Sequence, residues 1–170
     1  HLRVLCPAGE PLHRQDAELF RQYFSPNCVL QNALGTTETR TVTQFFINSE
    51  TELTESLIPI GRPVNGKSLL LLDNDRKEVE NGEIGEITVR SDYLSPGYWK
   101  RDDLTKEVFI EDSSGGCERT YLTGDLGRFD RHGMLFHLGR KDFQVKIRGY
   151  RIEISEVEMA LQGLQEVAET

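Results

Sequence analysis

The sequence predicts a mixed α/β protein built in three parts, which differ in their pattern of strands and helices. Residues 1–56 read as strand, helix and strand, which is typical of the end of an α/β sheet subdomain. Residues 57–139 hold short β runs separated by Gly, Pro, Asn and Asp, which predicts a small antiparallel barrel or sandwich. Residues 140–170 hold two alternating strands and one amphipathic helix, the start of a further subdomain.

The first part begins with an apolar strand at Leu2–Leu5. Apolar residues then recur at helical spacing from Leu12 to Phe24, with Pro11 suited to the first turn of that helix. A second strand, Cys28–Leu34, runs into the polar turn 35–39. Because α/β sheets hold ligands beyond the carboxyl ends of their strands, this turn is a candidate binding loop.

The middle part is predicted to be mostly strands. One strand is expected before this part, at Thr41–Ile47, and the others within it at Ser68–Leu72, Ile84–Arg90, Gly127–Asp130 and Met134–Leu138. Residues 131–133 suit a hairpin turn between the last two strands, and a short helix is expected at Asp103–Phe109.

The last part contains the strands Phe143–Arg148 and Tyr150–Ile154, which meet at Gly149. Ser155 and Glu158 then form a capping box at the start of a helix. A two-stranded ribbon and one helix cannot build a core alone, so we expect the chain to be part of a longer enzyme fold.

Composition excludes several classes of protein. The 170 residues are 37% apolar and 28% charged, which is enough for a core and unlike a disordered chain. The net charge of −8, without a basic block, disfavours nucleic acid as a partner. No apolar run reaches the roughly 20 residues of a membrane span, and no signal peptide is visible. Three scattered cysteines without a Cys-x-x-Cys pair fit a reducing cytoplasm.

One motif is deceptive. Residues 61–68 read Gly-Arg-Pro-Val-Asn-Gly-Lys-Ser and fit the P-loop pattern that cradles phosphates. A P-loop requires a helix after the Lys-Ser pair, whereas four leucines and turn residues follow here, which indicates a buried strand. We therefore expect Lys67 not to bind nucleotide phosphates.

Four other features of the sequence carry chemistry, each with a plainer alternative. The Gly35–Glu38 turn offers hydroxyls for phosphate oxygens and a carboxylate for Mg²⁺, but it also suits a helix cap. Asp125, in a turn, could hold a ribose diol or form an Asx-turn. Arg140 could bind a phosphate or pair with a surface acid. His137, between Phe136 and Leu138, could line a pocket or be a semi-buried core histidine.

The order of these segments resembles the adenylate-forming superfamily, which contains acyl-CoA synthetases, luciferases and the amino-acid adenylation domains of nonribosomal peptide synthetases. The resemblance covers the whole chain. It is carried by residues 8–10, 32–38, 82–87, 94–99, 121–126 and 139–153. The stretches 95–99 and 139–153 are most similar to the peptide-synthetase branch.

This resemblance implies a role for each candidate residue. It implies that Thr37 binds the α-phosphate, that Glu38 coordinates Mg²⁺, and that Arg140 reaches the ribose or the phosphates. It implies a nucleotide site formed by Gly9, Glu10, Asn32, Leu34, Thr37, Asp125, His137 and Arg140. Within it, Asp125 would hold the ribose hydroxyls and Asn32 would face the adenine edge. Leu34 and His137 stand where the family commonly has aromatic residues, so Leu34 implies an apolar contact with adenine in place of stacking.

The resemblance also implies an acyl pocket and a hinge. The pocket positions are Cys6, Ala8, Ala33, Thr41 and Val42, which are small and mostly apolar and suggest an uncharged substrate. Asp142 would be the hinge of the C-terminal subdomain. Gly149 would approach the pantetheine when that subdomain rotates.

The implied activity is ATP-dependent activation of a carboxylic acid, most simply an amino acid, with release of pyrophosphate. The acyl group would pass to a phosphopantetheine thiol of a carrier protein or domain, or alternatively to CoA. The family's upstream phosphate loop and C-terminal lysine are not in these 170 residues, so we expect them to be inactive alone. An acyl-CoA synthetase, a fatty-acyl-AMP ligase and a non-catalytic β-rich interaction module are the alternatives.

Overall fold

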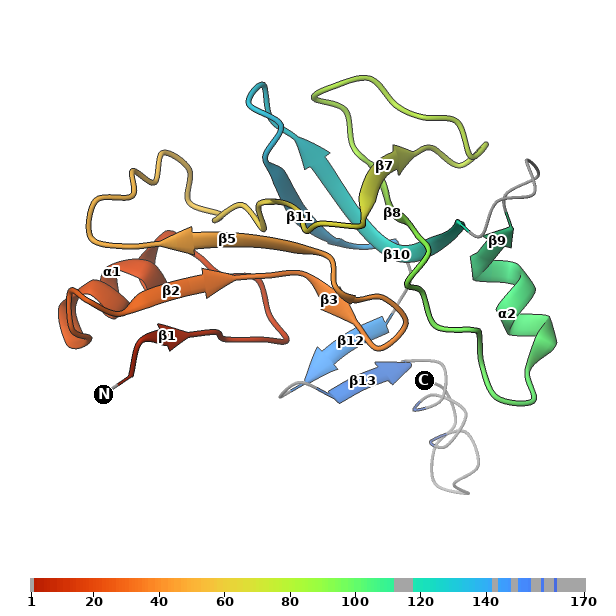
Figure 1. Ribbon diagram of the computed structural model, residues 1–170, viewed down its shortest axis with the longest axis horizontal. Coiled ribbons are helices and arrows are strands. Elements are labelled where there is room, and N and C mark those ends of the chain that lie inside the picture. Colours follow the sequence, from red (N-terminus) through yellow and green to blue (C-terminus); the bar gives the residue numbers. More distant parts are fainter. Residues whose placement is uncertain are drawn as a thin grey trace.

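The computed structural model describes residues 2–111, 118–141, 144–147, 150–153, 157 and 161. Its strands form two larger sheets and two short ribbons (Figure 1). One larger sheet has the order β1-β2-β5-β6 and the other the order β11-β10-β8-β7, with β9 paired to β10. The predicted mixed α/β class is confirmed.

The first sheet begins as an α/β unit. Its elements are β1 (Val4–Leu5), α1 (Arg14–Tyr23), β2 (Val29–Asn32), β5 (Thr43–Ile47) and β6 (Arg62–Pro63). β1 and β2 are parallel, whereas β5 and β6 pair antiparallel. The apolar face of α1 packs on this sheet, because Ala17 and Phe20 share a core cluster with Leu30 and Ile47.

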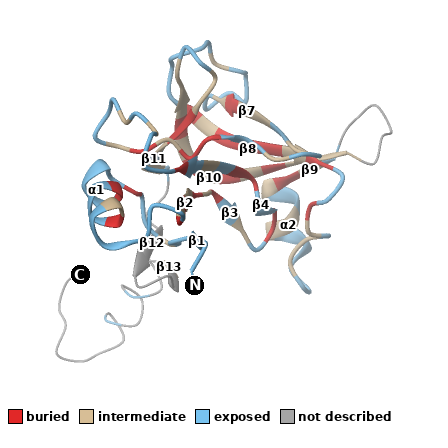
Figure 2. Cartoon of the chain, turned by 60° about the vertical axis from the view of Figure 1, so that its left-hand side comes forward, coloured by how far each residue is buried: buried red, intermediate tan, exposed pale blue. Residues whose placement is uncertain are grey.

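The second sheet is antiparallel. It contains β7 (Ser68–Leu72), β8 (Gly85–Ser91), β9 (Phe109–Glu111), β10 (Arg119–Phe129) and β11 (Leu135–Arg140), with α2 (Asp102–Val108) leading into β9. Figure 2 shows buried residues concentrated along β8 and β10. β8 is central and buried over most of its length, which explains its near-continuous apolar and threonine sequence.

The expected barrel is wrong in one respect, since the second sheet does not close among the described residues. Closure would require β7 and β11 to pair, yet they are the two ends of the sheet path. An isolated bridge between Gly61 and Leu135 connects the segment before β6 to β11. β10 is also longer than the predicted strand Gly127–Asp130, because its polar Thr-Gly-Asp segment hid the strand that precedes it.

Two ribbons complete the described chain. β3 (Gly35–Thr36) and β4 (Arg40–Thr41) form a short hairpin at the end of β2, and β12 (Gln144–Ile147) pairs with β13 (Tyr150–Glu153) as predicted. Figure 1 shows the β3–β4 hairpin at the end of β2 that is nearer to β10. Asp142, Gly149 and the capping box at Ser155 lie outside the described residues. Within the described part of the chain, no helix has the length and apolar character to cross a membrane.

Candidate functional site

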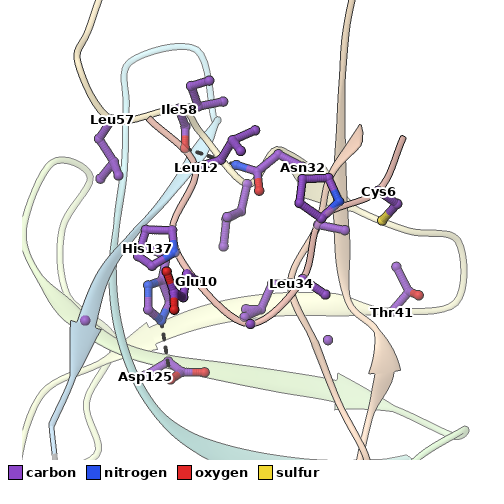
Figure 3. Close-up of a pocket in the computed structure, with 18 of the residues that line it drawn as sticks. Cys6, Glu10, Leu12, Asn32, Leu34, Thr41, Leu57, Ile58, Asp125 and His137 are labelled. Carbon is purple, nitrogen blue, oxygen red and sulfur yellow. Dashed lines mark hydrogen bonds and ion pairs between the residues drawn. The ribbon is translucent and has the colours of Figure 1, made fainter. Parts of the chain in front are cut away.

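A cavity of about 570 Å³ opens where the two sheets meet (Figure 3). It is lined by the loop after β1, the end of β2, the segment before β6, and strands β10 and β11. The lining residues are Cys6, Pro7, Ala8, Gly9, Glu10, Pro11, Leu12, Asn32, Ala33, Leu34, Gly35, Thr41, Leu57, Ile58, Ile60, Asp125, His137, Gly139 and Arg140. Segments far apart in sequence therefore form one site.

A distortion of β10 places Asp125 in this cavity. The register of β10 against β8 moves from Leu122 opposite Thr88 to Leu126 opposite Glu86, so β10 carries two extra residues between these pairs. Gly124 adopts a φ of 72°, which glycine accepts without strain. The hydroxyl of Thr123 accepts a hydrogen bond from the Asp125 amide. Such bulges bend a strand and re-aim a side chain, here a carboxylate that is 2% exposed.

Asp125 is the centre of a small charged cluster. Its Oδ1 accepts a 2.9 Å hydrogen bond from Arg140 Nη1 and lies 3.4 Å from His137 Nε2. Its Oδ2 is buried and accepts no hydrogen bond within the part of the chain that the structure describes. Burying a carboxylate oxygen without a donor is costly, so this atom is suited to a ligand hydroxyl.

Asn32 links the cavity to the segment before β6. Its Nδ2 donates to the carbonyls of Ile58 at 3.3 Å and Pro59 at 3.0 Å, as Figure 3 shows in part. Both amide hydrogens are used by these bonds, so Oδ1 remains as an acceptor. The Asn32 side chain is 6% exposed and therefore well fixed.

One wall of the cavity is aliphatic. Leu34 and Ile60 belong to the core cluster that also contains Ile87 and Leu135. The lining includes no Phe, Tyr or Trp side chain among the described residues. A planar ligand would therefore contact branched aliphatic groups here, and the His137 imidazole is also part of the lining.

Thr37 and Glu38 lie in the β3–β4 turn and do not line the cavity. Thr37 is exposed, whereas Glu38 is buried and its Oε1 accepts a 2.8 Å hydrogen bond from the Tyr98 hydroxyl. Burial, together with Tyr121 and Glu38, raises the pKa of Tyr98 well above its ordinary value. The Glu38 carbonyl also accepts a hydrogen bond of 2.8 Å from the Ser95 amide. The turn is thus tied to the 95–98 loop.

The cavity gathers eleven of the residues singled out from sequence. They are Cys6, Ala8, Gly9, Glu10, Asn32, Ala33, Leu34, Thr41, Asp125, His137 and Arg140. Val42 is not among them, because its fully buried side chain packs with Val89 and Tyr121 in a separate core cluster. Asp142 and Gly149 lie outside the described residues.

Sequence reasoning missed the aliphatic segment Leu57, Ile58 and Ile60. The apolar residues of this segment could have indicated a cavity wall, but the segment lies at the predicted boundary between residues 56 and 57. It is held at the cavity by the bonds from Ile58 N to Leu12 O and from Ile60 N to Leu135 O.

The residues present fit a magnesium ion that is held mainly by phosphate oxygens. Within the described ranges, no group of three or more His, Cys, Asp or Glu side chains could hold a metal. Glu38 would supply a single carboxylate, and Mg²⁺ commonly binds one or two carboxylates together with substrate phosphates and water. A cage made only of protein ligands is not present in this part of the chain.

Residues 1–99 match the profile described as AMP-binding enzyme. The chain belongs to this AMP-binding enzyme family. It is 39% identical over 168 residues to gramicidin S synthase 2 of Brevibacillus brevis, covering 99% of this chain and 4% of that protein. Its relatives and structural neighbours place it with the adenylation domains of nonribosomal peptide synthetases.

Two solved structures carry the same fold as this AMP-binding chain. PA1221, described as an NRPS protein containing adenylation and PCP domains, has a TM-score of 0.86 and 31% identity, over 99% of this chain and 34% of that one. The Vibrio cholerae adenylation domain AlmE, in complex with glycyl-adenosine-5'-phosphate, has a TM-score of 0.82 and 27% identity, over 99% of this chain and 31% of AlmE. The chain therefore spans about a third of the structures that it matches.

Proposed function

We propose that the protein containing this chain activates an amino acid with ATP and transfers it to a carrier domain. In the first step a carboxylate oxygen attacks the α-phosphorus, and the bond to the bridging oxygen of pyrophosphate breaks. In the second step a phosphopantetheine thiol attacks the acyl carbon and AMP leaves. The proposal is supported by family membership, by the glycyl-adenosine-5'-phosphate bound to AlmE and by the PCP domain of PA1221.

The observation that carries the proposal is the unsatisfied Oδ2 of Asp125. This oxygen is buried at the wall of the cavity, while Oδ1 is already held by Arg140 and His137. A ribose hydroxyl would donate to Oδ2 and remove the cost of the unpaired acceptor. Arg140 orients the carboxylate through its 2.9 Å hydrogen bond, and a guanidinium at this wall of the cavity is suited to a phosphate oxygen.

Asn32 would select adenine. Because its Nδ2 is occupied by two backbone carbonyls, it presents an acceptor to the cavity. The exocyclic amine of adenine is a donor and matches Oδ1, whereas the carbonyl of guanine does not. Leu34 and Ile60 would cover the ring by apolar contact.

Thr37 and Glu38 would act on the phosphates from the β3–β4 turn. Mg²⁺, when bound, offsets the negative charge that builds on the phosphates. Glu38 would hold the ion through its carboxylate, and the exposed Thr37 hydroxyl would donate to an α-phosphate oxygen. Both roles require the turn to be held in place before ATP arrives.

The acyl pocket would be lined by Cys6, Ala8, Ala33 and Thr41, whereas Val42 belongs to a separate core cluster. These side chains are small and uncharged, which favours an amino acid with an uncharged side chain. The Cys6 and Cys28 thiols are both free, which fits a cytoplasmic enzyme.

Asp142 would be the hinge and Gly149 would approach the pantetheine in the second step.

The test is ATP–pyrophosphate exchange by a complete adenylation domain that contains this chain. Exchange driven by an uncharged amino acid supports the proposal. Exchange driven by fatty acids would favour a fatty-acyl-AMP ligase, and thioester formation with free CoA in place of a carrier would favour an acyl-CoA synthetase. A complete domain whose melting temperature does not respond to Mg·ATP would point to a non-catalytic module.

A further inference from the structure

Lys67, from the segment that imitates a P-loop, lies outside the cavity lining and has a different partner. Its Nζ donates to the backbone carbonyls of Thr39 and Thr41, the second at 2.6 Å. Both carbonyls belong to the β3–β4 hairpin, although Lys67 is 26 residues further along the chain than Thr41. Burial lowers the pKa of the Lys67 ammonium, as expected for a group that has exchanged water for these carbonyls.

The turn that precedes Lys67 is anchored by two hydrogen bonds. Val64 N donates to Val42 O at 2.9 Å, which fixes the turn before β7 against the end of the hairpin. The Ser91 hydroxyl donates to Gly66 O at 2.7 Å and anchors the same turn to β8. The ammonium therefore reaches the hairpin from a turn that is hydrogen-bonded to the second sheet.

The hairpin needs such support because its backbone is strained at Arg40. Arg40 has a φ of 59°, a left-handed conformation that costs a residue with a side chain more than it costs glycine. Arg40 stands between the two carbonyls that Lys67 holds. Gly35 opposite is closely packed, since a Cβ there would lie 2.8 Å from Arg40 O. Strained backbone persists only where the surrounding structure enforces it.

We infer that Lys67 is a positioning residue that holds the β3–β4 turn, and with it Thr37 and Glu38, in the conformation needed for metal and phosphate binding. This inference rests on the proposed function for its catalytic consequence, but its structural part stands without it. Lys67 would act through two backbone carbonyls and would not touch ATP.

The main test compares Lys67→Met with wild type in the complete adenylation domain. Methionine keeps an unbranched stem of similar length and removes all three donors. Without nucleotide or metal, the amides of Thr39 and Val42 should exchange hydrogen about 10-fold faster, on the scale of lost hydrogen bonds from a charged group. In pyrophosphate exchange, the Mg²⁺ concentration for half-maximal rate should rise about 5-fold or more, while KM for the amino acid changes less than about 2-fold.

A second substitution provides the decisive control. Arg40→Gly makes the left-handed conformation at residue 40 less costly. The double variant Lys67→Met with Arg40→Gly should therefore return most of the way to the wild-type rate of hydrogen exchange. Its Mg²⁺ concentration for half-maximal pyrophosphate exchange should also return most of the way to the wild-type value. Arg76 is also left-handed, at a φ of 61°, and lies in an exposed turn away from the hairpin. Arg76→Gly combined with Lys67→Met should leave the hydrogen exchange and the Mg²⁺ dependence as they are in Lys67→Met alone. Lys67→Arg, which keeps the charge and donors, should stay within about 3-fold of wild type in both measurements.

Several results would overturn the inference. Unchanged exchange at Thr39 and Val42 in Lys67→Met would show that the lysine does not hold the turn. Equal recovery by Arg40→Gly and Arg76→Gly would show a general stability effect. A large rise in KM for ATP at saturating Mg²⁺ with normal hydrogen exchange would mean that Lys67 contacts phosphate directly. If Lys67→Met does not fold, Lys67→Gln, which keeps one donor group, takes its place in the same comparison.

The proposed function can fail separately. Wild-type protein without any amino-acid-dependent pyrophosphate exchange would remove the activity. The hydrogen-exchange comparison would still decide the role of Lys67 in the turn.

Discussion

Asp125 on β10 and Arg140 on β11 are direct register partners, and their side chains meet at 2.9 Å beside the cavity. The carboxylate is 2% exposed and the guanidinium side chain 13%. A buried pair of this kind contributes little net stability, but removing one partner leaves the other charge uncompensated. Under the proposed function, the main role of the pair would be to orient the Asp125 carboxylate toward a ligand.

Asp125→Asn tests the ribose role. The amide keeps the shape of the side chain but loses the charge that holds Arg140. We expect kcat/KM for ATP to fall at least about 10-fold, as for a lost hydrogen bond to a charged group, with KM for the amino acid nearly unchanged. Asp130→Asn is the matched control, because Asp130 Oδ1 caps the 130–134 turn and lies outside the cavity. Equal losses in both variants would contradict the assignment.

Asn32→Leu tests adenine selection. Leucine has a similar volume but neither accepts from adenine nor donates to Ile58 O and Pro59 O. KM for ATP should rise about 5- to 20-fold, and the preference for ATP over GTP should shrink. Gln31→Leu changes a neighbouring amide that instead pairs with Gln44, and it should leave both quantities unchanged. An unaltered ATP preference in Asn32→Leu would exclude the role.

Glu38→Ala tests the metal role. Loss of the carboxylate should reduce pyrophosphate exchange at least about 100-fold, on the scale of a lost electrostatic stabiliser. The control is Glu50→Ala in the exposed 48–51 turn. Exchange close to wild type at saturating Mg·ATP would rule out Glu38 as the metal ligand.

The raised pKa of Tyr98 predicts a pH dependence of stability. Burial and the contacts with Tyr121 and Glu38 keep its proton in the folded state, whereas the unfolded chain releases it near pH 10. The stabilisation is complete below about pH 10 and declines as the pH rises further. Tyr98→Phe should therefore lower the melting temperature clearly at pH 8 and by less at pH 11. Tyr93→Phe, at a tyrosine that is 74% exposed, should show no such difference, and the idea fails if the two variants behave alike.

Asp142→Pro tests the predicted hinge between β11 and β12. Proline fixes one φ near −65° and should limit rotation there. Pyrophosphate exchange should stay within a few-fold of wild type, while thioester formation on the carrier should fall about 10-fold or more. Measuring the two half-reactions separately decides the matter, since equal losses or equal retention would place the pivot elsewhere.

Much of the fold was predictable because local patterns decide it. The β7 strand Ser68–Leu72 was predicted residue for residue, since four consecutive leucines bounded by turns leave little alternative. The rejection of the P-loop followed from the same strand. In contrast, β10 was predicted only over its last residues, because the bulge at Thr123–Asp125 interrupts the alternation that marks a strand.

For the site, the sequence by itself determined which groups are available: the Asp125 carboxylate, the Arg140 guanidinium, the Asn32 amide and the Gly35–Glu38 turn. Residue type fixes the chemistry that each can perform. Only the tertiary structure decided which atoms remain for a ligand, because hydrogen-bond partners come from distant segments. Asn32 is left with an acceptor by Ile58 and Pro59, and Lys67 is turned toward the carbonyls of Thr39 and Thr41. Such pairings depend on how two sheets meet, which no local pattern of side chains encodes.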